Sequence, residues 1–297
     1  MLREELKKYV LDEYNDYITY KSLAEMENDE VRRRILSNLS TKEYEHYTFW
    51  LQLSGYKPNP PSRIRIRLIM MFRRLLGLVF IARLLERHER SVIKWYRELY
   101  TILPAKERET LFHIIREEEE HEKMLIGEIE ETIVKYLGYI VLGLADAIIE
   151  ISGVHAGFLG ATSVTLLAGV AGLVVGFAAS ISMAVAAYLQ AKQAPTIVPL
   201  KAAILTGITY ILTVILQALP FFLTTDILNA FAVSIIISIT LLAGFTYYGA
   251  VIRDIDSRRE IATNIALTLG TATATYVFGD LLSSWLGIKS FYGGIHG

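Results

Sequence analysis

Residues 139–190 read YIVLGLADAIIEISGVHAGFLGATSVTLLAGVAGLVVGFAASISMAVAAYLQ, and Asp146 and Glu150 are the only formal charges among them. A helix that crosses the hydrocarbon core of a membrane needs about 20 predominantly apolar residues. The stretch is long enough for two such helices, and Gly160 begins a Gly-Ala-Thr-Ser break between them. It therefore predicts two consecutive transmembrane helices.

The rest of the C-terminal half has the same character. Residues 202–225 and 227–252 carry no formal charge, and a soluble core has no need of so much uncharged length. We therefore expect an all-α fold whose membrane part has five transmembrane helices. Their expected positions are about residues 138–160, 164–190, 201–220, 227–252 and 261–285.

Most charged residues lie in the N-terminal half. The chain has 297 residues, with 31 acidic and 30 basic side chains, but only seven of the acids and six of the bases follow residue 138. This uneven charge predicts a polar domain over residues 1–135 and a membrane domain over residues 136–297. The net charge of −1 gives no long-range attraction to nucleic acid, so no such partner is expected. The absence of cysteine excludes disulfides and thiolate metal ligands.

Five of the six basic residues of the membrane domain lie in two connections between helices, and the sixth, Lys289, follows the last predicted helix. Lys192 and Lys201 flank the second connection, and the fourth contains Arg253, Arg258 and Arg259. Short loops rich in Lys and Arg stay in the cytoplasm. We therefore expect a multi-pass protein of the cell membrane whose N-terminal domain is cytoplasmic and whose C-terminus lies outside.

The polar domain has apolar residues at helical spacing. A Gly- and Pro-rich segment beginning at Gly55 and the pair Leu103-Pro104 interrupt this pattern. The last of the predicted helices can continue into the first transmembrane helix. We expect four main helices, at about residues 3–27, 29–54, 78–101 and 104–135.

An internal repeat carries the chemistry of the polar domain. Each of its two copies has a Glu followed seven residues later by a Tyr, and a Glu-x-x-His motif follows further along the chain. Residues seven apart, like residues three apart, share one face of a helix. The residues of the first copy are Glu13, Tyr20, Glu43 and His46, and those of the second are Glu89, Tyr96, Glu118 and His121.

This set of residues predicts a metal site. Two helices with one Glu each and two helices with Glu-x-x-His each supply the inward ligands of carboxylate-bridged dinuclear sites in four-helix bundles. Carboxylate oxygens and imidazole suit iron and manganese. We therefore predict dinuclear iron, or manganese, bound within one bundle that is completed by one chain or by two. Glu86, one turn before Glu89, can replace that residue as a ligand or supplement it.

Other polar side chains near the motif have two alternative roles. Tyr20 and Tyr96 can hydrogen-bond the metal carboxylates, or they can be ordinary half-buried tyrosines. The neighbouring glutamates are expected to form a solvated acidic face rather than to bind metal. These are Glu45, Glu117, Glu119, Glu120 and Glu122.

The order Glu-x6-Tyr and then Glu-x-x-His, present twice, resembles the rubrerythrin-like branch of the ferritin-like superfamily over about residues 3–130. The resemblance implies a bundle that binds paired metal ions and can oxidise ferrous iron. The chain has no cysteine pairs, so it lacks the rubredoxin-type electron-transfer centre of rubrerythrins. This difference argues against a peroxidase.

Between the second and third main helices, residues 62–76 read SRIRIRLIMMFRRLL. A basic and apolar helix of this kind can lie in the headgroup layer of a membrane, with its arginines near lipid phosphate. It can equally be a buried segment or a connector of the bundle. The sequence leaves both roles open.

Two carboxylates lie inside the first predicted transmembrane helix. Asp146 and Glu150 are four residues apart and share a face. Ionisable groups inside a membrane cost about 2.5–3.5 kcal/mol each and usually mark an ion or proton path. A structural salt bridge would need a basic residue, and the five predicted helices contain none in their interiors. We therefore expect a transport path, to which the soft thioether of Met183 can contribute.

Two segments, GLADAIIEISG at 143–153 and SMAVAAY at 182–188, resemble the vacuolar iron transporter and manganese exporter family over about residues 138–285. The resemblance implies a metal path at a two-fold dimer interface, with proton antiport. Eukaryotic members carry a helical metal-binding insert after the second helix, and here the polar domain would take its place. The order of the two domains is similar to that of the membrane-bound ferritins of prokaryotes. The residues that would line the path are Asp146, Glu150 and Met183.

These features predict a homodimeric transporter that exports Fe²⁺ or Mn²⁺ from the cytoplasm, with a di-iron domain that captures, senses or oxidises the ion first. The alternative is a membrane-anchored di-iron oxidase or peroxidase that transports nothing. An inert anchor has no need of Asp146 and Glu150. The sequence does not choose between iron and manganese, or between a ferroxidase site and a site that only captures metal.

Overall fold

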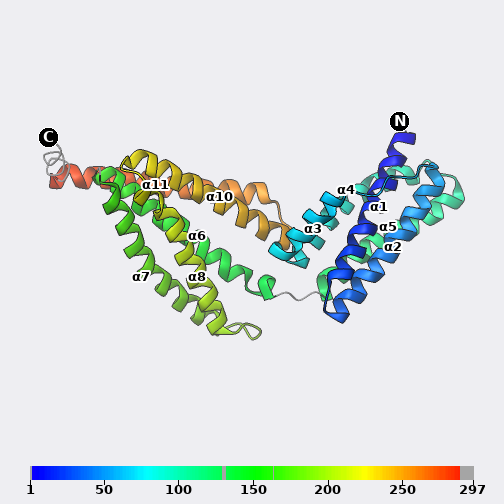
Figure 1. The fold of residues 1–297 in the computed structure, drawn as a ribbon, viewed down its shortest axis with the longest axis horizontal. Helices are drawn as coiled ribbons and strands as arrows, with labels where there is room; N and C mark the ends of the chain where they lie inside the picture. Colours follow the sequence, from blue (N-terminus) through cyan, green and yellow to red (C-terminus); the bar gives the residue numbers. More distant parts are fainter. Residues whose placement is uncertain (1, 129–131, 163, 288–297) are drawn as a thin grey trace. The chain divides into compact units, whose positions relative to one another are not determined.

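The computed structural model describes residues 2–128, 132–162 and 164–287. All regular structure among these residues is helical, and the chain divides into two compact units, Met1–Val134 and Lys135–Gly297 (Figure 1). The predicted all-α fold is confirmed. The division falls where the sequence changes from charged to apolar.

The N-terminal unit contains the four main helices expected from the sequence and a shorter helix between the second and third of them. The carboxylate of Asp29 accepts a hydrogen bond from the backbone N–H of Arg32 at 2.9 Å and so caps the second helix. Gly55 ends that helix at φ 65°, a left-handed conformation that glycine adopts without steric cost. The helices are α1 (Leu2–Met26), α2 (Glu30–Ser54), α3 (Arg63–Leu76), α4 (Leu78–Tyr100) and α5 (Ala105–Glu128).

One hydrophobic core holds four of these helices together. Buried side chains of α1, α2, α4 and α5 contribute to it. The ring of Trp50 in α2 lies 5.1 Å from the ring of Tyr9 in α1 and 4.8 Å from the ring of Tyr96 in α4, measured between centroids. Aromatic pairs at these distances stabilise a core beyond the area that they bury. The core therefore sets the positions of the side chains that face the interior of the unit.

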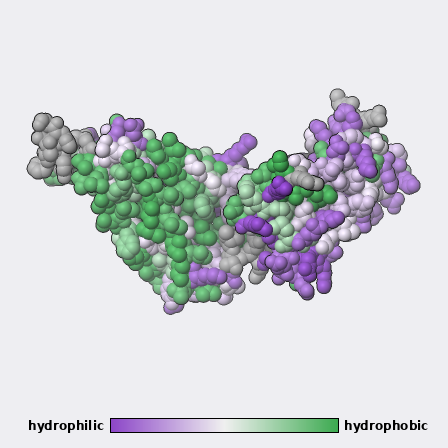
Figure 2. Space-filling view, in the orientation of Figure 1, coloured by the Kyte–Doolittle hydropathy of each residue, from purple (hydrophilic) through white to green (hydrophobic). Residues whose placement is uncertain are grey.

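The C-terminal unit consists of apolar helices. Among the described residues, five helices are long and apolar enough to cross a membrane, as predicted, and hydrophobic side chains cover much of their visible surface (Figure 2). A four-residue helix, α9 (Pro220–Leu223), follows the third of them. The predicted continuity of α5 with the first membrane helix concerns residues 129–131, which lie outside the described residues. The membrane helices are α6 (Thr132–Ala161), α7 (Thr165–Ala191), α8 (Pro199–Ala218), α10 (Ile227–Arg253) and α11 (Ser257–Leu286).

Glycines let α6 and α11 approach each other closely. A Cβ atom at Gly279 of α11 would meet the backbone of Gly157 in α6, and a Cβ atom at Gly160 of α6 would meet the carbonyl oxygen of Tyr276. Inside a membrane the hydrophobic effect does not drive helices together, so close backbone packing at small residues contributes much of their association. The contact therefore holds the first membrane helix against the last.

We expect Gly279→Ala to lower the melting temperature of the detergent-solubilised protein, because the added methyl group meets the Gly157 backbone. The matched variant is Gly270→Ala in the same helix, where a Cβ atom has nothing within 4 Å. There, alanine should leave the melting temperature unchanged or raise it, since alanine favours a helix over glycine by about 1 kcal/mol. Equal melting temperatures for the two variants would contradict the close packing of α6 on α11.

Candidate functional site

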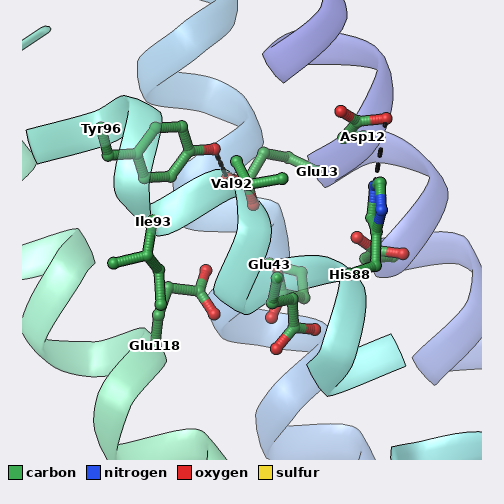
Figure 3. A pocket seen from close by; sticks show the side chains of 10 residues that line it. Asp12, Glu13, Glu43, His88, Val92, Ile93, Tyr96 and Glu118 are labelled. Atoms are coloured by element: carbon green, nitrogen blue, oxygen red, sulfur yellow. Dashed lines mark hydrogen bonds and ion pairs between the residues drawn. The ribbon is translucent and has the colours of Figure 1, made fainter. Parts of the chain in front are cut away.

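Four buried ionisable side chains meet inside the N-terminal unit. Glu13 comes from α1 and Glu118 comes from α5. Glu43 and His46 come from α2, where a spacing of three residues places them on one face. One ligand atom of each side chain lies within 4.8 Å of those of the other three, and Figure 3 shows the three glutamates around one pocket. Such a cluster can bind a metal ion.

The imidazole of His46 has different partners on its two nitrogens. Its Nδ1 lies 2.8 Å from Glu118 Oε1, 3.6 Å from Glu13 Oε2 and 3.7 Å from Glu43 Oε2. Its Nε2 lies 3.1 Å from Glu117 Oε2. Burial lowers the pKa of His46, but hydrogen bonds to the surrounding glutamates outweigh this effect and raise the pKa well above its usual value. A protonated His46 therefore supplies positive charge among the carboxylates.

Glu117 lies outside the cluster, as expected, but it is only partly solvated and contacts His46, which the sequence did not predict. Its side chain is only 33% exposed, and it accepts a hydrogen bond from Lys42 Nζ at 2.8 Å in addition to its contact with His46. The hydrogen bonds with His46 and Lys42 lower the pKa of Glu117 to about 2. Glu117 therefore stays ionised and holds the imidazole ring with Nδ1 toward the cluster. Helical spacing could not reveal this role, because it depends on the neighbouring helix.

Burial, together with neighbouring carboxylates, shifts several carboxyl groups of the pocket toward their protonated forms. Burial raises the pKa of Glu13 to about 8 although the nearby imidazole of His46 opposes the shift. Burial and the nearby negative charges also raise the pKa of Asp16 and of Glu89. A divalent cation would relieve this repulsion. Carboxylate oxygens with one imidazole nitrogen form a donor set that suits Fe²⁺ or Mn²⁺.

Each of the two tyrosines of the repeat donates a hydrogen bond to a carboxylate that belongs to the other copy of the repeat. The hydroxyl of Tyr96 donates to Glu13 Oε1, and the hydroxyl of Tyr20 donates to Glu89 Oε1 at 3.2 Å. Each tyrosine therefore contacts the glutamate of the other copy and not the glutamate seven residues before it. Both rings are buried, and burial raises the pKa of both hydroxyls. The hydroxyls thus remain protonated donors that hold the two carboxylates in place.

The other predicted ligands lie as follows. Glu89 of α4 lines the pocket together with the clustered glutamates. Glu86 is buried, and its Oε2 lies 3.4 Å from Arg83 Nη1. The side chain of His121 lies outside the described residues, so the second Glu-x-x-His pair is represented by Glu118 alone.

Three further polar residues line the pocket and were not predicted. Asp16 of α1 lies one turn after Glu13 and is buried. Asp12 and His88 face each other, with 3.7 Å between Asp12 Oδ1 and His88 Nε2 (Figure 3). A search for acids three or four residues from Glu13 would have found Asp16, because that spacing keeps residues on one helix face.

The two carboxylates of the membrane unit are half-buried on α6. The hydroxyl of Tyr210 in α8 donates a hydrogen bond to Glu150 Oε2, and Asp146 lies one turn away along the helix. Met183 of α7 packs against the buried cluster that includes Tyr210. Three helices therefore bring Glu150, Tyr210 and Met183 into one region. Tyr210 was not predicted, although a tyrosine inside a charge-free span is a signal, since its buried hydroxyl needs a partner.

A second polar cluster joins the same part of α6 to two other helices. The amide oxygen of Gln217 in α8 accepts hydrogen bonds from Ser152 of α6 at 3.1 Å and from Ser238 of α10 at 2.8 Å. The amide nitrogen of Gln217 donates to the carbonyl of Ala147 at 3.3 Å. All three polar side chains are buried. These bonds position α6, and with it the two carboxylates, against α8 and α10.

Part of the membrane unit is similar to a known family. Residues 191–280 match the VIT family, and this stretch runs from the end of α7 through α8 and α10 into α11. It does not include the helix that carries Asp146 and Glu150. No curated protein and no solved structure matches the chain. Together with the five apolar helices, the similarity to the VIT family indicates a multi-pass membrane protein whose substrate is a metal ion.

Proposed function

We propose that the protein exports Fe²⁺ or Mn²⁺ from the cytoplasm by proton antiport. The observation that carries the proposal is the presence of Asp146 and Glu150 inside the first helix of a membrane unit whose residues 191–280 are similar to the VIT family. By insertion scales, an ionisable group inside a membrane costs about 2.5–3.5 kcal/mol. An inert anchor gains nothing from that cost, whereas a path for cations needs negative charge.

The side chains around these carboxylates suit a transition metal. Carboxylate oxygens can replace water around a divalent ion, and a thioether favours transition metals over Na⁺ or Ca²⁺. We propose that Asp146 and Glu150 replace water around the ion and that Met183 favours a transition metal. The hydrogen bond from Tyr210 orients Glu150 without neutralising its charge. A carboxylate held in this way can exchange a metal ion for a proton, as antiport requires. We place the path at the two-fold interface of a homodimer.

We further propose that the N-terminal unit is a ferritin-like, rubrerythrin-like domain with a dinuclear site. The buried cluster of Glu13, Glu43, His46 and Glu118 supports this assignment, since its members come from three of the four helices that share one core. Glu89 lines the same pocket and, with His121, would complete the ligand set of such sites. Bound iron would supply the redox chemistry of a ferroxidase. The protein side chains would bind the ion and release the protons that it displaces.

The basic residues support a cytoplasmic position for the N-terminal unit. Lys192 and Lys201 lie at the connection from α7 to α8, and Arg253 and Arg258 lie at the connection from α10 to α11. Two membrane helices separate the two connections, so both face the same side, which the positive-inside rule places in the cytoplasm. The N-terminus precedes two helices and faces that side as well, and the C-terminus lies outside. Metal captured by the N-terminal cluster would then be available to the path.

The cluster should bind metal in the purified full-length protein. We expect Glu43→Gln combined with Glu118→Gln to weaken Mn²⁺ or Fe²⁺ binding more than about tenfold, because two anionic ligands become neutral. The matched control is Glu45→Gln, since Glu45 lies on the same helix as Glu43 but is exposed. Equilibrium dialysis with metal analysis measures the difference. Unchanged metal content in the double variant would contradict the ligand assignment.

One substitution separates a transporter from an anchored oxidase or peroxidase. In proteoliposomes, Asp146→Asn should abolish Fe²⁺ and Mn²⁺ flux, because asparagine keeps the size of the side chain and removes its charge. Metal binding by the N-terminal cluster should persist in this variant. Asp226→Asn is the control, since Asp226 caps α10 and asparagine is an equally good capping residue. Normal flux through Asp146→Asn would favour the anchored enzyme.

A capturing role predicts an effect that depends on metal concentration. Glu43→Gln combined with Glu118→Gln should raise the metal concentration needed for half-maximal flux and leave the maximal flux unchanged, because the membrane path is intact. Flux assays over a range of free metal test this expectation. Identical curves for the double variant and the unmodified protein would exclude capture and leave the transport path itself untouched.

A further inference from the structure

Helix α3 exposes a continuous apolar stripe. The side chains of Ile64, Leu68, Met71, Phe72 and Leu75, named here the α3 stripe, are between 42% and 67% exposed. At 100° per residue they fall within an arc of about 100° on the helix surface. A buried connector would turn such residues inward, so this helix face is not part of the core of the unit.

Arginines border the α3 stripe on both sides. On the helical wheel, Arg65 lies along one edge, and Arg67 and Arg74 lie along the other. All three are exposed, and residues 63–76 contain no acidic residue. In Figure 2, hydrophobic side chains at the position of α3 lie beside strongly hydrophilic ones. An apolar face with basic edges is typical of a helix that lies in a membrane interface.

The opposite face of α3 is attached to the rest of the N-terminal unit. Arg73 Nη2 donates a hydrogen bond to Glu27 Oε2 at 2.6 Å, next to the end of α1. Burial raises the pKa of Glu27, but hydrogen bonds from the Asp29 backbone and from Arg73 outweigh it and lower the pKa, so the pair stays ionised. This attachment holds the helix with its stripe outward.

We propose that the α3 stripe binds the surface of a membrane that contains anionic lipids, with Arg65, Arg67 and Arg74 at the lipid phosphates. Two observations favour lipid over a second copy of the chain. The N-terminal unit is covalently linked to a membrane helix, so lipid is always present at high effective concentration. Two α3 helices face to face would also bring like charges together, whereas anionic headgroups attract them. The proposal rests on membrane insertion of the C-terminal unit and not on metal transport.

The absence of cysteine in the chain makes the test direct. Leu68→Cys, and separately Phe72→Cys, are labelled with a nitroxide in the full-length protein and reconstituted into vesicles of phosphatidylcholine with phosphatidylglycerol. Both labels should collide with dissolved oxygen and be shielded from a water-soluble nickel complex. The control is Ile102→Cys, whose position is 69% exposed and lies outside α3. Its label should remain accessible to nickel.

The arginines supply a second arm of the experiment. Arg65→Gln, Arg67→Gln and Arg74→Gln, combined in the Leu68→Cys protein, should raise nickel accessibility at position 68 several-fold. For the Leu68→Cys protein with its arginines intact, vesicles of phosphatidylcholine alone should also raise nickel accessibility at position 68. Nickel accessibility at positions 68 and 72 equal to that at position 102 in anionic vesicles would overturn the proposal. Spin–spin broadening at position 68 that disappears on dilution with unlabelled protein would also overturn it, because a second copy would then cover the stripe.

Discussion

Buried carboxylates that lie close together need positive charge or protons between them, and the N-terminal unit is organised around this electrostatic requirement. Glu13, Glu43 and Glu118 surround Nδ1 of His46 at 2.8 to 3.7 Å. Burial, and to a smaller extent the charges of Glu43 and Glu118, raises the pKa of Glu13 to about 8 although His46 opposes the shift. The aromatic core around Trp50 prevents the helices from separating to relieve the repulsion. A divalent ion in place of the Nδ1 proton of His46 would bring more positive charge among these carboxylates.

The carboxylates of the membrane unit have a different environment. Glu150 receives a hydrogen bond from the Tyr210 hydroxyl, and within the described part of the chain no basic side chain is seen to pair with it. A salt bridge would compensate the charge permanently, and replacing it by a metal ion would cost the energy of breaking the pair. A hydroxyl orients the carboxylate and leaves its charge uncompensated. Half-burial of Asp146 and Glu150 keeps both within reach of an ion, in agreement with the path that we propose.

The two membrane attachments of the N-terminal unit would differ in kind. Its link to α6 is covalent, whereas the α3 stripe would bind lipid reversibly through five apolar side chains and three arginines. Reversible attachment of this type is sensitive to the charge of the lipids and to salt. The helix can serve in this way because its Arg73–Glu27 ion pair lies on the opposite face.

The sequence by itself determined the five membrane helices, the four main helices of the N-terminal unit and the faces on which the repeated glutamates and His46 lie. These are local properties: a run of about 20 apolar residues and a period of 3.6 residues can be recognised without knowing any neighbour. Only the tertiary structure decided which side chains meet across helices. It pairs Tyr96 with Glu13, places Glu117 on the outer nitrogen of His46, and turns the α3 stripe outward. The spacing of residues determines the face of a helix that a side chain occupies. The partner of that side chain depends on the rotation and offset of the neighbouring helix, and the packing of the whole core sets both.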